Sequence, residues 1–186
     1  MALTALSEAM ATLLGSCTLT PESEVVPLDQ ALSRFCAQSV TAGMAVPPAD
    51  NSAMDGYAVC SRDVPGVLTV SQRIPAGSVS RPLEKGTAAR IFTGAEMPMG
   101  ADAVVLQEDT EETAQGIRLP AVEVGQHIRR RGNDIQPEDQ LVAVGQYLGP
   151  QDIGLLASVG IDRIAVFEPL TVAIMTTGDE LRDPGS

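Results

Sequence analysis

The stretch "DNSAMDGYAV", residues 50–59, places two carboxylates, an amide, a hydroxyl and a glycine ahead of a short apolar run. It follows the rigid dipeptide Pro47-Pro48. Asp, Asn, Ser and Gly favour turns for local reasons. Carboxylates and amides are also hard oxygen ligands, suited to Mg²⁺ or to hydrogen bonds with sugar and phosphate groups. The stretch alone therefore leaves two hypotheses open, an ordinary turn and one wall of a site for cations and phosphates.

The composition is that of a folded, acidic protein. Hydrophobic residues make up 44% of the 186 residues, but aromatics only 3% and Trp is absent. The core must therefore be built from Ala, Val, Leu and Ile. The 24 acidic residues exceed the 12 basic ones and give a net charge of −12. Because nucleic acids and anionic membranes attract positive surfaces, we expect neither among the partners.

Cysteine usage and the N-terminus indicate a cytoplasmic protein. Cys17, Cys36 and Cys60 are odd in number and lack the CxxC spacing of a zinc site, which favours reduced thiols. No basic segment followed by an apolar run marks a secretory signal. No stretch approaches the roughly 20 apolar residues that span a bilayer.

Three helices are predicted. Apolar residues recur at helical spacing from Leu3 to Leu14, and Gly15 ends that run. Asp29 is placed to cap a second helix that reaches Gln38. The third covers Gln151–Ser158, with Pro150 before it and Gly160 after it.

From Gly43 onward the sequence predicts a β-rich domain with hairpins, because short β-favouring runs alternate with Gly and Pro clusters. The predicted strands are Gly56–Val59, Val67–Val70, Ala88–Phe92, Ala103–Leu106, Ile117–Leu119 and Leu141–Val144. A further strand is expected at Arg163–Phe167.

The run Leu170–Met175 is wholly apolar and is followed by "TTGDEL". A continuous apolar strand that ends in a polar Gly turn is typical of a parallel α/β sheet, whose strands bind ligands at their carboxyl ends. The 186 residues hold no further strands to complete such a sheet. We therefore interpret the chain as a fragment that ends just inside a truncated α/β domain.

Two more stretches could carry chemistry. In "RIFTGAEMPMGADAVVLQED", Thr93 follows a strand, where its hydroxyl and nearby backbone N–H groups would meet an anion or would merely cap the strand. The acidic residues from Glu108 to Glu112 are expected to form a solvated face. In "HIRRRGNDI", Arg129 and Arg131 would point the same way on a strand. Next to Asp134 they suit a phosphate or oxyanion, although pairing with the chain's own carboxylates is equally open.

The remaining candidates are His127, which as a lone histidine is more often structural, and the carboxylates of "TTGDEL". Asp179 and Glu180 would hold a metal or a ligand there, or Asp179 would cap a helix. No P-loop, GxGxxG, HExxH or nucleophile elbow is present. From the residues alone, the pattern indicates metal-assisted handling of an anionic, phosphate-bearing ligand.

Four stretches, "DNSAMDGYAV", "IFTGAEMPMGADAVV", "IRRRGNDI" and "TTGDEL", resemble in order and spacing the molybdopterin molybdenumtransferase family, to which the gephyrin E domain belongs. The similarity runs from about Val25 to Leu181. It implies insertion of molybdenum from molybdate into the dithiolene of molybdopterin. The substrates would be molybdate and adenylylated molybdopterin, the cofactor Mg²⁺, and AMP would be released.

The resemblance also implies an architecture of mixed α and β structure. A linking domain of helices and strands would comprise residues 23–41 and 139–168, and residues 42–138 would form an inserted β-rich domain. Residues 1–22 would hold an N-terminal helix that packs on a missing third domain, and residues 169–186 would begin that truncated α/β domain. The full-length protein would be a homodimer, with a molybdopterin adenylyltransferase as its upstream donor.

Carried over by motif, the implied site divides into three sets. The catalytic residues would be Asp55, Thr93, Asp134 and Glu180, of which Asp55 and Glu180 would hold the metal. Ser52, Arg129, Arg131 and Asp179 would bind the ligand. Because the family's active site lies between domains, this fragment alone is expected to be inactive.

Two departures concern packing rather than chemistry: Ala49 replaces a usual aromatic, and Cys60 stands where Arg is frequent. A scaffold without turnover is an alternative function, since the gephyrin branch anchors receptors. The intact acidic set favours the enzyme. A general Mg-nucleotide hydrolase is the weaker alternative, because it has no P-loop to support it.

Overall fold

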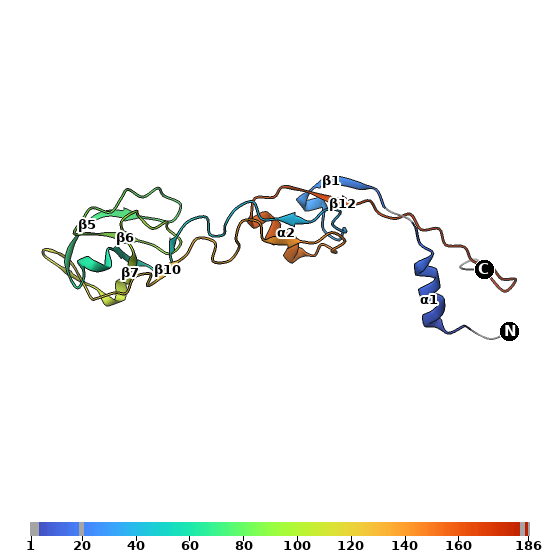
Figure 1. The fold of residues 1–186 in the computed structure, drawn as a ribbon, viewed down its shortest axis with the longest axis horizontal. Coiled ribbons are helices and arrows are strands. Elements are labelled where there is room, and N and C mark those ends of the chain that lie inside the picture. The colour runs from blue at the N-terminus through green and yellow to red at the C-terminus, as the bar shows by residue number, and fades with distance from the viewer. Residues whose placement is uncertain (1–3, 19–20, 183–184, 186) are drawn as a thin grey trace. The chain divides into compact units, whose positions relative to one another are not determined.

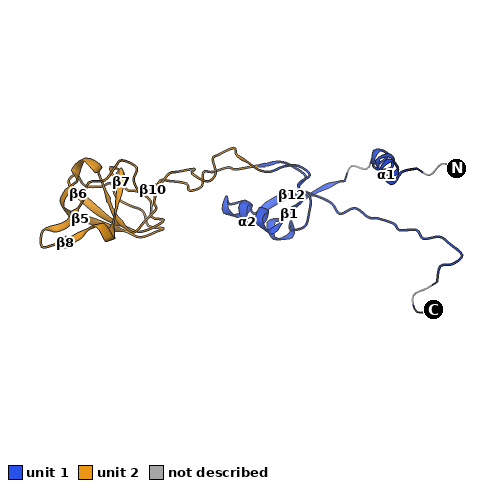
Figure 2. Ribbon diagram, turned by 90° about the horizontal axis from the view of Figure 1, so that it is seen from below, with its two compact units in different colours: residues 1–40, 142–186 blue, residues 41–141 orange. Residues whose placement is uncertain are grey.

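The computed structural model describes residues 4–18, 21–182 and 185. The chain divides into two compact units, residues 1–40 with 142–186 and residues 41–141 (Figures 1 and 2). The fold is mixed α and β with mostly sheet and few helices, which confirms the predicted class at this level. None of the helices in the described ranges combines the length and apolarity that crossing a bilayer requires.

The unit formed by residues 41–141 is built on a six-stranded sheet with the order β7-β4-β6-β5-β9-β8. The β5–β6 pair is parallel, and the other four pairs are antiparallel. The strands are β4 (Gly56–Val59), β5 (Gly66–Ile74), β6 (Thr87–Ile91), β7 (Ala103–Leu106), β8 (Glu111–Thr113) and β9 (Gly116–Leu119). The β runs predicted for this region are confirmed, with β5 longer than expected and β8 not foreseen.

The sheet is buried on both faces at β4, because successive side chains of a strand point to opposite sides. Tyr57 and Val59 join an apolar cluster with Leu68, Val105, Ile117 and Leu119. Ala58, between them in sequence, joins a second cluster with Ile74, Ile91 and Val104. With so few aromatic residues in the chain, aliphatic side chains fill both clusters, as the composition predicts.

The other unit contains a two-stranded antiparallel sheet of β1 (Ser23–Pro27) and β12 (Arg163–Phe167) and the helix α2 (Pro150–Ser158). The Asp152 carboxylate accepts a hydrogen bond from the Gly149 amide at 2.8 Å and so caps the start of α2. The predicted third helix and the predicted strand at Arg163–Phe167 are both confirmed. The 3₁₀ turn η1 (Leu28–Gln30) follows β1 directly.

Two short sheets and two 3₁₀ turns complete the list. β2 (Val40–Thr41) pairs with β11 (Gln140–Val142), and β3 (Asn51–Ser52) pairs with β10 (Ile128–Arg129). Single 3₁₀ turns lie at η2 (Ser61–Asp63) and η3 (Gln107–Asp109).

The N-terminal helix α1 (Leu6–Gly15) forms as predicted, and Gly15 ends it. None of its residues is buried, and Leu6, Leu13 and Leu14 keep at least two thirds of their surface exposed. The expectation that this helix packs on another domain stays a prediction.

The helix predicted from Asp29 to Gln38 is wrong. Only the turn η1 forms there, and the backbone beyond it bonds to distant segments. Cys36 donates its amide to the Gln146 carbonyl at 2.8 Å, and Ala37 donates to the Ala165 carbonyl at 2.9 Å. These long-range bonds take the amides that a helix would use within itself, so tertiary pairing overrides the apolar spacing.

The strand predicted at Leu170–Met175 is also not formed. Residues 169–178 have no regular secondary structure, and Ile174 and Met175 are 87% and 90% exposed. A strand needs a neighbour to bond its N–H and C=O groups. Within the described residues, no segment pairs with this one.

Gly56 is required by the close approach of β4 and β7. A Cβ atom at this position would lie 2.0 Å from the Val105 carbonyl oxygen. We expect Gly56→Ala to destabilise the 41–141 unit by about 2–3 kcal/mol, because the backbone of β7 must shift. The measurement is urea unfolding followed by the amide signals of β4 and β6.

Gly43→Ala is the matched control, because a Cβ there meets nothing within 4 Å. It should change the free energy of unfolding by less than about 0.5 kcal/mol. Equal urea midpoints for Gly56→Ala and the unmodified chain would contradict the packing described for β4.

Candidate functional site

The segment that begins at Asp50 is bonded along one edge to the loop after β6. The Ser52 amide donates to the Ala95 carbonyl, and the Met97 amide donates to the Asp50 carbonyl, both at 2.9 Å. The Gly94 amide donates in turn to the Ser52 carbonyl, also at 2.9 Å. These bonds fix the "TGAEMP" loop against the stretch quoted first.

The opposite edge of the same segment is bonded to the third motif. β3 and β10 pair so that Asn51 faces Arg129 and Ser52 faces Ile128. The Ala53 amide donates to the His127 carbonyl at 2.9 Å. Three of the four motifs singled out from the sequence therefore meet at one place in the fold, within the 41–141 unit.

Asp55 and Thr93 form the tightest polar contact at this place. The Thr93 amide and the Thr93 hydroxyl both donate to Asp55 Oδ1 at 2.8 Å. The pKa of the Asp55 carboxyl lies below its ordinary value of 3.8. The hydrogen bond from the Thr93 amide lowers it most, and the hydrogen bond from the Thr93 hydroxyl and the more distant charge of Arg90 add to the effect. Oδ2 accepts no hydrogen bond from the described residues, so one oxygen of this half-buried, ionised carboxylate is left without a donor.

Arg90 lies beside this pair and was not predicted. Its guanidinium donates to the Gly56 carbonyl at 2.8 Å and to the side-chain oxygen of Gln107. The pKa of Glu108 is lowered mainly by the hydrogen bond from the Gln107 side chain. The charge of Arg90 also lowers it. The sequence signal was present, since Arg90 is the one charged residue of β6 and lies three residues before Thr93.

Asp50 has a structural role in the turn. Oδ2 accepts from Arg130 at 2.6 Å, and Oδ1 accepts from the Arg131 amide at 2.8 Å. The amide bond and the Arg130 guanidinium keep the pKa of Asp50 below its ordinary value, against a smaller opposing effect of desolvation. This carboxylate therefore holds the arginine run in place.

The arginine run is largely paired with carboxylates, as one of the two hypotheses proposed. Arg129 bonds to Asp134, and Arg130 bonds to Asp50. The strand ends at Arg129, so the predicted alternation of Arg129 and Arg131 along a strand is wrong. The Arg131 guanidinium forms no ion pair with the described residues.

Ser52 is only 2% exposed, and its hydroxyl donates to the Met54 carbonyl at 2.6 Å. This burial argues against the predicted ligand contact, since the side chain is used inside the turn. Asp179 and Glu180 belong to the other unit and are exposed. No helix follows Asp179 in the described residues, so its alternative role as a helix cap stays a prediction.

The structure thus brings together Asp55 and Thr93, whereas Asp134 is bonded to Arg129. Among the described residues, no three His, Cys, Asp or Glu side chains are grouped to hold a metal. Mg²⁺ is nevertheless usually bound by one or two carboxylates with waters and substrate phosphates. Asp55 fits the part of a single protein ligand in such an arrangement.

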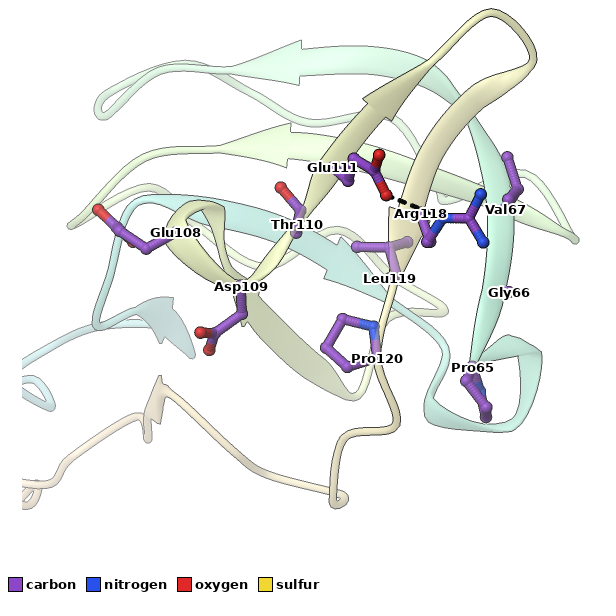
Figure 3. A pocket seen from close by; sticks show the side chains of 10 residues that line it. All are labelled: Pro65, Gly66, Val67, Glu108, Asp109, Thr110, Glu111, Arg118, Leu119 and Pro120. Carbon is purple, nitrogen blue, oxygen red and sulfur yellow. Dashed lines mark ion pairs between the residues drawn. The ribbon is translucent and has the colours of Figure 1, made fainter.

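A hollow of about 610 Å³ lies nearby on the same unit, and Figure 3 shows its lining. Asp55 and Thr93 are not among the residues that line it. Glu108, Asp109 and Glu111 are exposed there, which confirms the expected solvated face. Glu111 of β8 forms an ion pair at 3.1 Å with its register partner on β9, Arg118. Because its one arginine is already paired, we assign no ligand to this hollow.

Comparison with known families decides the relationship. Residues 4–160 match the model of the MoeA N-terminal region (domain I and II). The chain belongs to this family. The resemblance drawn from the four motifs is thereby confirmed.

Relatives of this MoeA N-terminal region carry the same name in distant organisms. The chain is 35% identical to a molybdopterin molybdenumtransferase of Haemophilus influenzae, over 97% of this chain and 46% of the relative. It is 37% identical to molybdopterin molybdenumtransferase 2 of Mycobacterium tuberculosis, over 87% of this chain and 42% of the relative. The chain therefore spans less than half the length of these curated relatives.

Solved structures of the family share the fold. The molybdopterin biosynthesis MoeA protein of Pyrococcus horikoshii superposes with a TM-score of 0.79 at 35% identity. The match covers 86% of this chain and 43% of that one. A second structure of that protein gives the same TM-score at 32% identity.

The Asp55–Thr93 contact makes a prediction about pH. Thr93→Val removes the hydroxyl donor and keeps the amide, so the pKa of Asp55 should rise toward 3.8. The stability that the low pKa contributes is present above that ordinary value and is lost as pH falls through the folded value. Carboxyl ¹³C titration measures the change directly.

Thr93→Ser retains the hydroxyl donor and should leave the pKa of Asp55 unchanged. An identical titration curve for Thr93→Val and the unmodified chain would show that the hydroxyl does not bind this carboxylate.

Proposed function

We propose that this chain is the N-terminal part of a molybdopterin molybdenumtransferase acting in molybdenum cofactor biosynthesis. The full-length protein would insert molybdenum from molybdate into molybdopterin and would release AMP from adenylylated molybdopterin. Family membership and the names of the relatives support the enzyme class. The reaction itself is our proposal for the longer protein.

The observation that carries the proposal is the state of Asp55. The carboxylate is ionised at neutral pH, is oriented by two hydrogen bonds from Thr93 to Oδ1, and keeps Oδ2 without a donor among the described residues. A carboxylate that served only to cap a strand would gain nothing from this unbonded oxygen. The arrangement suits a hard cation or a hydrogen-bonding ligand.

Asp55 is the residue that would hold Mg²⁺ in this unit, and Thr93 would fix its orientation. When bound, the cation would offset the negative charge of the adenylate phosphates. Glu180 as a second metal ligand, Asp134 as a catalytic residue, and Arg129, Arg131 and Asp179 as ligand contacts remain proposals. The pairing of Arg129 with Asp134 means that an anionic ligand would have to compete for Arg129.

The finer organisation is proposed on the same basis. Residues 23–41 with 139–168 would form the linking domain, residues 42–138 the inserted β domain, and residues 169–186 the start of an α/β domain. In that domain Leu170–Met175 would gain the strand neighbours it lacks here. The full-length protein would be a cytoplasmic homodimer supplied by a molybdopterin adenylyltransferase, and the 186 residues alone would be inactive.

The test replaces Asp55 by Ala in the full-length protein and measures molybdenum insertion with adenylylated molybdopterin, molybdate and Mg²⁺. We expect a loss of about tenfold to a hundredfold, because one ligand of the cation is removed. Asp109→Ala is the matched control, since Asp109 is an exposed carboxylate of the same unit. Unchanged insertion by folded Asp55→Ala protein would refute the assignment.

A further inference from the structure

Two arginines lie side by side on the sheet next to Asp55 and Thr93. Arg73 of β5 and Arg90 of β6 are register partners in the parallel pair, and Tyr57 of β4 is the partner of Arg90 on its other side. Register partners point to the same face of a sheet, and like charges placed opposite each other destabilise it. The arrangement therefore carries an electrostatic cost that needs an explanation.

Phe92 holds both guanidinium groups. The Cζ atom of Arg73 lies 4.4 Å from the centre of the Phe92 ring, and that of Arg90 lies 4.5 Å from it. Arg90 also lies 5.3 Å from the Tyr57 ring. Cations at these distances are attracted to the ring faces. The aromatic contacts keep the two positive charges close together without any carboxylate between them.

Arg73 and Arg90 have no carboxylate partner, unlike four other arginines of the described residues. Arg34, Arg118, Arg129 and Arg130 all form ion pairs with Asp or Glu. Among the described residues, by contrast, no carboxylate lies within ion-pair distance of Arg73 or Arg90. Acidic residues outnumber basic ones two to one in the sequence, so carboxylates are plentiful. The two unpaired charges thus stand at a position where an outside anion would compensate them.

The two arginines differ in what they can still bind. Arg90 already donates to the Gly56 carbonyl and to Gln107, so its guanidinium is fixed in place. Arg73 is exposed and donates no side-chain hydrogen bond to the described residues. Its donors are available in the planar arrangement that matches an oxyanion. Arg73 would make the direct contact, and Arg90 would add positive charge behind it.

The position relates this pair to the candidate site. Thr93 follows Phe92 directly, and its amide and hydroxyl bind Asp55. The charge of Arg90 reaches Asp55, since it contributes to the low pKa of that carboxyl. An anion at Arg73 would therefore lie near any cation held by Asp55, the arrangement expected for a metal-bound phosphate.

We propose that Arg73 and Arg90, stacked on Phe92, form a subsite for a tetrahedral oxyanion of the ligand beside Asp55. The inference rests on the proposed function and extends it by naming residues that bind the anionic group. A phosphate of a nucleotide and free molybdate share this chemistry, and the experiment separates them.

The test titrates the 186-residue chain, labelled with ¹⁵N, with inorganic phosphate, AMP and molybdate in turn. The signals followed are the Phe92 and Thr93 amides and the arginine Nε–H groups. Arg73→Gln should weaken binding by about fivefold or more, because it removes a charge-assisted contact. Arg62→Gln is the matched control, since it removes the same charge from an exposed arginine of the same unit.

Arg73→Lys keeps the charge but loses the planar donors, so we expect intermediate binding. If Arg73→Gln does not fold, the binding measured for Arg73→Lys tests the subsite in its place. Stronger binding of phosphate and AMP than of molybdate would identify a phosphate subsite, and the reverse order a molybdate subsite. No saturable shift with any of the three anions, or an equal loss in Arg62→Gln, would overturn the inference.

A parallel measurement in the full-length protein separates this inference from the proposed function. Arg73→Gln should raise KM for one anionic substrate by about fivefold with kcat retained, as expected for loss of a binding contact. Wild-type KM in Arg73→Gln, together with lost insertion in Asp55→Ala, would refute the subsite and leave the function standing. Wild-type insertion in both variants would refute both.

Discussion

The backbone of residues 50–59 is hydrogen-bonded along both edges, and the arrangement of the 41–141 unit depends on this. Its first part lies between the loop after β6 and the strand β10. Its second part is β4, which lies between β6 and β7 in the six-stranded sheet. Because backbone N–H and C=O groups must be paired when buried, the segment fixes the position of every chain portion bonded to it. The polar residues of three sequence motifs meet here for that reason.

The same constraint separates structural from available charges. The Asp50 carboxylate is bonded to the arginine run, and the Ser52 hydroxyl is bonded within its own turn. Asp55 lies five residues after Asp50, directly before β4, where Thr93 bonds to Oδ1 and leaves Oδ2 without a donor. Arg73 and Arg90 contribute positive charge across the adjoining strands. A short piece of sheet thus presents an ionised carboxylate and unpaired guanidinium groups next to each other, which is the chemistry that a metal-bound, phosphate-bearing ligand requires.

Much of this was predictable from local patterns. Apart from β8, the strands of the sheet follow from hydrophobic periodicity and from Gly and Pro positions, as α1 and α2 do, and all of these signals act over a few residues. The helix expected at Asp29–Gln38 failed because its amides bond to Gln146 and Ala165, more than a hundred residues away in sequence. Leu170–Met175 has strand composition but no neighbour to pair with. Composition specifies a strand only when the partner is present.

The site was predictable in part for similar reasons. Thr93 stood out as a polar residue at a strand end and Asp55 was singled out by the family resemblance, and the structure brings the two into contact. The Arg73–Phe92–Arg90 stack was not foreseen, because it depends on the parallel register of β5 and β6, which no local pattern encodes. The sequence likewise could not decide whether Arg129 pairs with a carboxylate or binds a ligand, because that depends on Asp134 lying next to it in the fold.

The central claim is that the unbonded oxygen of Asp55 binds a cation that accompanies a phosphate-bearing ligand. The most direct measurement is a crystal structure of the full-length protein with Mn²⁺ in place of Mg²⁺ and with AMP. We predict an anomalous peak about 2.1 Å from Asp55 Oδ2, near a phosphate oxygen. A metal-bound AMP whose cation lies on other residues, with Asp55 uninvolved, would contradict the account.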